Sequence, residues 1–148
     1  MSARLPPELT VGFEEIDRQH RRMIDLMNAA TAAARTGDLA AVRAAVASLG
    51  DELVTHFSSE EGFMAEALYP DRARHKAAHD LFLQDFAQLG KELEAGLSDL
   101  AVHWLTVRVP EWVKFHIGVN DVPLGQYLTA RHFRPEQPRS TDAKSRPS

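Results

Sequence analysis

The sequence predicts an all-α fold, an antiparallel up-down-up-down four-helix bundle with a short C-terminal helix and a disordered tail. Apolar residues recur at steps of three and four along four segments of roughly 20 to 30 residues, the period of a helix with one buried face. Proline and glycine separate these segments, and the short connections between them favour antiparallel neighbours. No segment shows the apolar–polar alternation of a strand.

The first two expected helices cover residues 17–36 and 39–68. Asp17 and Asp38 stand at their starts, where an N-cap side chain can bond to free backbone N–H groups. Pro70 stops the second helix, because the residue before a proline avoids helical geometry. The first seam reads Ile16, His20, Met23, Met27, Ala30 and Ala34, and the second reads Val42, Val46, Leu49, Leu53, His56 and Glu60.

The third and fourth expected helices begin after the N-cap candidates Asp71 and Ser98. Their seams read His75, His79, Phe82, Phe86, Leu89 and Leu93, then Val102, Leu105, Val109, Trp112, His116 and Val119. Pro110 is expected to kink the fourth helix, because it removes a backbone donor. Pro123 is expected to break that helix ahead of a short final helix over residues 124–132.

Length and composition predict one domain over residues 1–133, followed by a disordered tail over residues 134–148 that lacks apolar periodicity. A net charge of -4 argues against nucleic acid or an anionic membrane as partner. The absence of cysteine excludes disulfides, thiolate zinc sites and iron–sulfur clusters. With no apolar run of membrane-spanning or signal-peptide length, we expect a cytoplasmic protein.

Polar residues occupy seam positions where a plain bundle would carry Leu, Ile or Ala. They are His20, His56, Glu60, His75, His79 and His116. A single core histidine commonly bonds to a neighbour, but five of the seven histidines aimed at one axis would each need a buried partner. Five imidazoles and a carboxylate suit a first-row transition metal and exceed the needs of one zinc, so two bridged ions are expected. His103 and His132 fall off the pattern and are expected at the surface.

A second bridging carboxylate is then required. Asp121, five residues after His116, is the best candidate, because the helix is expected to break there and can turn it inward. Its alternative role is that of a surface or turn residue. Glu61 follows Glu60 directly, so it leaves the seam and is expected to meet solvent.

Four motifs contain these residues: Ile16-Asp17-x-x-His20, His56-Phe-Ser-Ser-Glu-Glu-Gly-Phe-Met64, Tyr69-Pro70 followed by His75-x-x-x-His79, and His116-Ile-x-x-x-Asp121 followed by Pro-Leu-Gly-Gln-Tyr-Leu. Over about residues 10–131 the chain resembles the hemerythrin family, and within it the single-domain bacterial members. The resemblance implies two iron ions in an oxo- or hydroxo-bridged di-iron centre. By that resemblance, His75, His79 and His116 complete one iron. His20 and His56 hold the other with one open position, and Glu60 and Asp121 bridge.

The resemblance further implies reversible O2 binding, as a carrier, store or delivery protein rather than an enzyme, with any protein partner unknown. Four apolar residues beside the ligands are expected to line the O2 pocket and keep water away, besides packing the core: Met23, Phe57, Trp112 and Val119. Pro110, Gly118 and the flexible Met23 put O2 affinity and autoxidation rate in question. Two alternatives stay open: an O2 or redox sensor acting through a partner protein, and a di-iron peroxidase or NO-handling enzyme.

Overall fold

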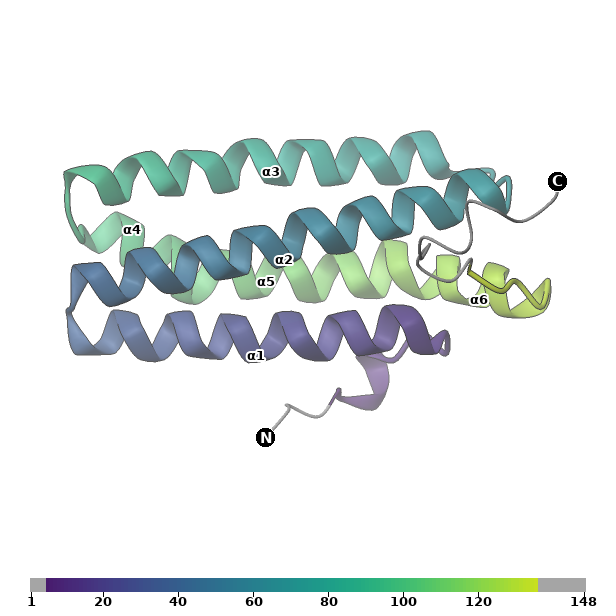
Figure 1. Cartoon of the computed structure of the whole chain (residues 1–148), viewed down its shortest axis with the longest axis horizontal. Coiled ribbons are helices and arrows are strands. Elements are labelled where there is room, and N and C mark those ends of the chain that lie inside the picture. Colours follow the sequence, from purple (N-terminus) through teal and green to yellow (C-terminus); the bar gives the residue numbers. More distant parts are fainter. Residues whose placement is uncertain (1–4, 136–148) are drawn as a thin grey trace, which may run out of the picture.

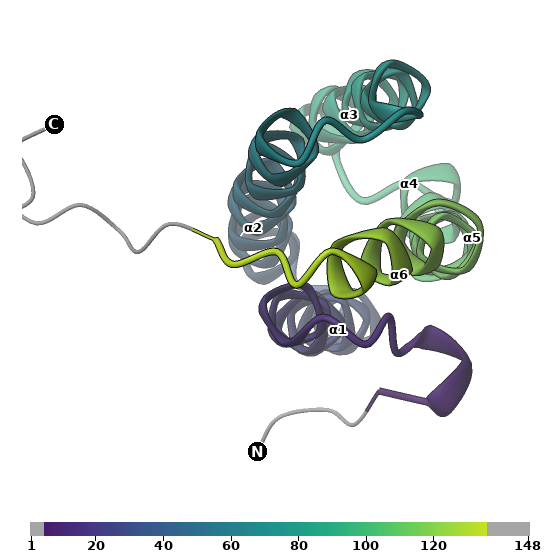
Figure 2. The same cartoon turned by 90° about the vertical axis from the view of Figure 1, so that its right-hand side faces the viewer.

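The computed structural model describes residues 5–135 and confirms the four-helix bundle. Its elements are η1 (Pro7–Leu9), α1 (Glu14–Thr36), α2 (Leu39–Glu66), α3 (Arg72–Ala95), α4 (Asp99–His103), η2 (Trp104–Arg108), α5 (Val109–His116), η3 (Ile117–Asp121) and α6 (Val122–Ala130). The elements from α4 to α6 follow one another as the fourth rod of an antiparallel bundle (Figure 1). Seen end-on, the four rods surround a common axis (Figure 2). Most of the expected tail, residues 136–148, lies outside the described residues.

Local capping explains where most of the helices begin and end. The Asp38 side chain accepts hydrogen bonds from the backbone N–H groups of Ala40 and Ala41, and Ser98 caps α4 in the same way. Gly37 ends α1 with a φ of 74°, a conformation that glycine adopts without strain. The predicted caps at Asp38 and Ser98 are therefore confirmed.

Of the two other cap predictions, that for Asp17 was wrong, and that for Asp71 is confirmed in position but not in its hydrogen bond. Helix α1 begins at Glu14, and Asp17 lies buried within its first turn. Its carboxylate accepts hydrogen bonds from the backbone N–H groups of Val11, at 2.8 Å, and Gly12, at 3.2 Å. Asp17 therefore ties the N-terminal lead-in to the bundle. Asp71 holds the N-cap position of α3, but its side chain makes no capping hydrogen bond.

The fourth rod continues through both prolines, contrary to the predicted break at Pro123. It does so through the π-helical segments η2 and η3, each of which ends just before a proline-containing turn. The N–H of Val109 bonds to the carbonyl of Trp104, and that of Val122 to Ile117, each five residues back. A helical proline crowds the carbonyl one turn earlier, and the wider π turn relieves that crowding.

Each π segment adds a residue to its turn and so rotates the apolar seam of the fourth rod. The buried apolar residues of this rod are Ala101, Leu105, Val109, Val113, Ile117, Leu124 and Leu128. Of the predicted seam, Val102 and Trp112 are only half-buried, and Val119 is 53% exposed. The constant helical period used for the prediction fails here, because the period itself changes along the rod.

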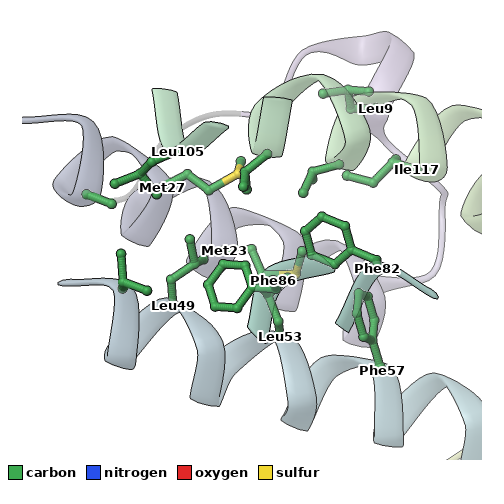
Figure 3. Packing of buried hydrophobic residues seen from close by; sticks show 14 of the residues in the cluster. Leu9, Met23, Met27, Leu49, Leu53, Phe57, Phe82, Phe86, Leu105 and Ile117 are labelled. Carbon is green, nitrogen blue, oxygen red and sulfur yellow. The ribbon is translucent and has the colours of Figure 1, made fainter. Parts of the chain in front are cut away.

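Apolar core residues lie on both sides of the polar seam residues along the helices: Ile16, Met64, Leu124 and Leu128 toward one end of the bundle, and a larger group toward the other. Leu49 and Leu53 of α2 pack there with Met27 of α1, Phe86 of α3 and Leu105 of the fourth rod (Figure 3). The polar seam residues lie in the first halves of α1 and α3 and the second halves of α2 and the fourth rod. Antiparallel order brings these halves to one level. No helix within residues 5–135 is long and apolar enough to cross a membrane.

Candidate metal centre

Seven side chains from all four rods meet inside the bundle, each no more than 3% exposed. They are His20 of α1, His56 and Glu60 of α2, His75 and His79 of α3, His116 of α5 and Asp121 of η3. The pairs on α2 and α3 stand four residues apart, so each pair shares one helical face. These are the seven residues that the sequence nominated, and the fold brings all of them together.

Asp121 faces the other six side chains because of a π turn that the sequence analysis did not predict. In an α-helix, a residue five positions along points about 140° away from the first. In η3, five residues make roughly one turn, so Asp121 returns to the face of His116. His116 Nε2 lies 3.2 Å from Asp121 Oδ1. Asp121 therefore lies beside the other candidate ligands, as the sequence analysis expected, but a π turn and not the expected helix break brings it there.

The seven side chains divide into two donor groups that share both carboxylates. One group is Glu60, His75, His79, His116 and Asp121, and the other is His20, His56, Glu60 and Asp121. Within each group the donor atoms lie within 4.8 Å of one another. The first group therefore offers five ligands to a metal ion, and the second offers four.

Each carboxylate directs one oxygen to each group. Glu60 Oε1 lies 3.1 Å from His75 Nε2 and 3.2 Å from His79 Nε2, whereas Oε2 lies 3.2 Å from His56 Nε2. Asp121 Oδ1 lies 3.0 Å from His75 Nε2, whereas Oδ2 lies 2.9 Å from His20 Nε2. This division of oxygens is the arrangement that a carboxylate adopts when it bridges two metal ions.

The protonation pattern of the histidines fits a pair of cations. His56 Nδ1 lies 2.6 Å from Gln19 Oε1, and His79 Nδ1 lies 2.9 Å from Glu61 Oε2. Both oxygens only accept, so each Nδ1 donates, and in a neutral ring the inner Nε2 carries the lone pair.

The inner atoms are crowded in a way that a cation would relieve. His56 Nε2 lies 3.2 Å from His20 Nε2, and His79 Nε2 lies 3.0 Å from His116 Nε2. Lone pairs that converge at this range repel unless a cation or a proton lies between them. Among the described residues, buried Glu60 Oε2 and Asp121 Oδ1 also have no hydrogen-bond partner. The donor set therefore fits two metal ions.

In the metal-free protein, protons take the place of these cations. Burial lowers the pKa of His56, but the charge of Glu60 and the nearby carboxylate of Asp121 outweigh burial and raise it to about 10. Burial also lowers the pKa of His75, yet its close contacts with the carboxylates of Asp121 and Glu60 raise it to about 9. Burial raises the pKa of Asp121, but His116 outweighs burial and holds it well below its usual range.

Two residues of this centre escaped the sequence analysis. Glu61 was expected to meet solvent, but its side chain is only 27% exposed and bonds to His79. Gln19, which bonds to His56, was not singled out. Metal-binding histidines generally donate their second ring N–H to an acceptor. A search for acceptors adjacent in sequence to His20 and Glu60 would have nominated both residues.

The expected pocket lining is only partly in place. Phe57 stacks on His79, with ring centroids 4.0 Å apart and planes at 9°, and Trp112 stacks on His116 at 4.5 Å and 10°. Met23 is buried. Val119 points outward, so its predicted role was wrong, because the π turn rotates it away from the centre. Ile117 is the buried aliphatic residue of that turn.

Comparisons with known proteins agree with this geometry. The family described as "Hemerythrin HHE cation binding domain" matches residues 11–121. A bacteriohemerythrin of Methylococcus capsulatus is 36% identical over 121 residues, 81% of this chain and 89% of that protein. One from Stenotrophomonas maltophilia is 33% identical over 77% of this chain and 73% of its own. A wild-type hemerythrin crystal structure has a TM-score of 0.79 and 31% identity, covering 86% of this chain and 97% of that one. The chain belongs to the hemerythrin family.

Proposed function

We propose that this protein binds O2 reversibly and serves as a carrier, store or delivery protein in the cytoplasm. The hemerythrin family binds O2 through a non-heme di-iron centre. The proposal rests on one observation, the unequal division of ligands around two shared carboxylates. Five protein ligands and a solvent-derived bridge would complete six positions on one iron. Four ligands and the same bridge would leave the other iron with one position open.

His75, His79 and His116 would hold the five-ligand iron, His20 and His56 would hold the other, and Glu60 and Asp121 would bridge them. Two ferrous ions held by these residues would supply the electrons for O2 binding and recover them on release. Phe57 and Trp112 cover His79 and His116 with apolar rings and so keep bulk water from these ligands.

The surrounding protein offers few groups for further chemistry. Among the described buried residues, two ionisable side chains lie outside the seven. Asp17 is engaged by the backbone of Val11 and Gly12, and burial raises the pKa of Tyr69 above its ordinary value. Glu61 is engaged by His79. Among residues 5–135, the buried centre therefore has no carboxylic acid or imidazole free to protonate bound oxygen, and the Tyr69 phenol is too weak an acid to do so readily. This favours release of O2 over peroxidase or oxidase turnover.

His56→Ala tests the proposal, and His103→Ala, at an exposed position, is the matched control. We expect His56→Ala to lower the iron content and to lose the colour that appears in air and disappears on deoxygenation. The control should keep two irons per chain and the full colour cycle. An unchanged colour cycle in His56→Ala would overturn the site assignment. A wild-type centre that holds two irons but oxidises irreversibly in air would instead indicate a redox sensor or a peroxidase.

A further inference from the structure

The two donor groups differ in the residue that accepts the hydrogen bond from the outer ring nitrogen, Nδ1, of a histidine. His79 belongs to the five-ligand group, and its Nδ1 donates to a carboxylate oxygen of Glu61 at 2.9 Å. His56 belongs to the four-ligand group, and its Nδ1 donates to the amide oxygen of Gln19 at 2.6 Å. One ring is therefore supported by an acid side chain and the other by a neutral one.

This difference acts on the metal through the ring. A carboxylate that accepts the outer N–H makes the imidazole a more basic ligand, because it stabilises positive charge on the ring. It also brings a negative charge near the metal. Both effects favour the more highly charged oxidation state, Fe(III) over Fe(II). His79 is fully buried, so little water lies along the ring to screen the effect.

We propose that Glu61 is a positioning residue that makes the two irons electronically unequal, so that the first electron lost from the diferrous centre leaves the iron held by His79. The inference rests on the proposed ligand assignment. With ferricyanide as oxidant, one electron passes to it, one iron becomes Fe(III), and ferrocyanide forms. The iron held by His56, which carries the open position, stays Fe(II) in the half-oxidised protein.

The surroundings of Glu61 make this effect partial. Glu61 lines a surface pocket of about 320 Å³ together with Arg72 and Lys76, so solvent and two cations lie near its outer side. Lys76 is itself bonded to Asp80 at 2.8 Å. Loss of an outer partner of a metal-binding histidine typically changes metal affinity by about 10- to 100-fold. We take the lower end, about tenfold between the two oxidation states, or about 59 mV for one electron.

The chain supplies its own matched pair of substitutions, Glu61→Gln and Gln19→Glu. An anaerobic redox titration of the iron-loaded protein should resolve two one-electron midpoint potentials. Glu61→Gln should raise the lower potential by about 59 mV and leave the upper one in place. Gln19→Glu should lower the upper potential instead. The double exchange should show both shifts at once, and Mössbauer spectra of the half-oxidised protein should report a larger share of Fe(III) at the iron held by His56 than in the wild type.

Glu66→Gln, on the exposed side of α2, controls for loss of a negative charge alone. The inference is overturned if Glu61→Gln shifts the potentials no more than this control does, or raises the upper potential. Such a result would leave iron content and reversible colour intact, so the proposed function would stand. A wild-type protein that loads two irons without binding O2 would remove the proposed function, while the potential shifts would still decide the role of Glu61.

Where Glu61→Gln fails to hold two irons, a Co(II) titration replaces the potentials. If Glu61→Gln weakens one of the two Co(II)-binding steps and Gln19→Ala weakens the other, Glu61 and Gln19 have separate roles at the two metal positions. Equal weakening of both steps in each variant overturns the inference. Circular dichroism of the metal-free variants identifies any that do not fold.

Discussion

Phe57→Ala tests whether the ring over His79 both stabilises the bundle and shields the centre. The Phe57 ring is 2% exposed and lies flat on His79, and it meets the rings of Phe82 and Trp112 at centroid distances of 6.2 and 6.0 Å. Truncating a buried phenylalanine to alanine costs about 3–5 kcal/mol, as lost burial plus the cavity left behind. In a chain of this size each kcal/mol lowers the Tm by about 2–4 °C, so we expect a drop of roughly 6–20 °C.

The assay is thermal unfolding of the metal-free protein followed by circular dichroism. Phe115→Ala is the matched control, because the same truncation is made at a ring that is 67% exposed. Its effect should stay within about 0.5 kcal/mol. In the iron-loaded protein, Phe57→Ala should also shorten the life of the oxygenated form, because the space beside His79 admits water.

Equal Tm losses in the two variants would refute the packing argument for Phe57. A large loss of Tm in Phe57→Ala with an unchanged rate of autoxidation would leave the packing argument standing. It would remove the shielding role of the ring, and water would then reach the centre by another path.

Three further predictions concern pH, packing and the tail. Because the pKa values of His56 and His75 are raised from 6.5 to about 10 and about 9, their stabilisation of the metal-free fold is complete below pH 6.5 and lost as pH rises through 9–10. The metal-free Tm should therefore fall from pH 7 to 10, and zinc loading at pH 7 should release protons; a Tm that rises would contradict this. Gly125→Ala places a Cβ 2.5 Å from the Val11 carbonyl oxygen and should cost about 1–3 kcal/mol in chemical denaturation, whereas Gly90→Ala, with open space, should not destabilise. Removal of residues 134–148 should leave the O2 colour cycle intact, and loss of a pull-down partner on truncation would favour a sensor.

The periodicity of the chain was sufficient to predict the four helices and six of the seven candidate ligands. A buried helical face repeats every three to four residues, so a histidine at such a position must point into the bundle whatever its partners are. His20 and His75 could therefore be assigned without knowing how the rods pack. Asp38 and Ser98 could be assigned as caps for a similar reason, because a cap bonds within its own turn.

In the fourth rod, the assumption of a constant α-helical period gave wrong predictions of which side chains face the core. Asp121 was nominated from its spacing to His116, but only the π turn of η3 explains how it faces the centre. The same turn carries Val119 outward, against the prediction. Whether a helix ends at a proline or continues through a π turn depends on the packing around it. The residues next to Pro123 in the sequence are therefore not enough to predict which of the two occurs.

In the first three helices, the sequence by itself determined which side chains enter the bundle, because helical periodicity is a local property. Only the tertiary structure decided which of these side chains contact one another. The division of the oxygens of Glu60 and Asp121 between two histidine groups, and the pairing of Glu61 with His79 and of Gln19 with His56, join residues on different helices. Such contacts depend on the relative rotation and level of packed helices, which the periodicity of one helix does not contain.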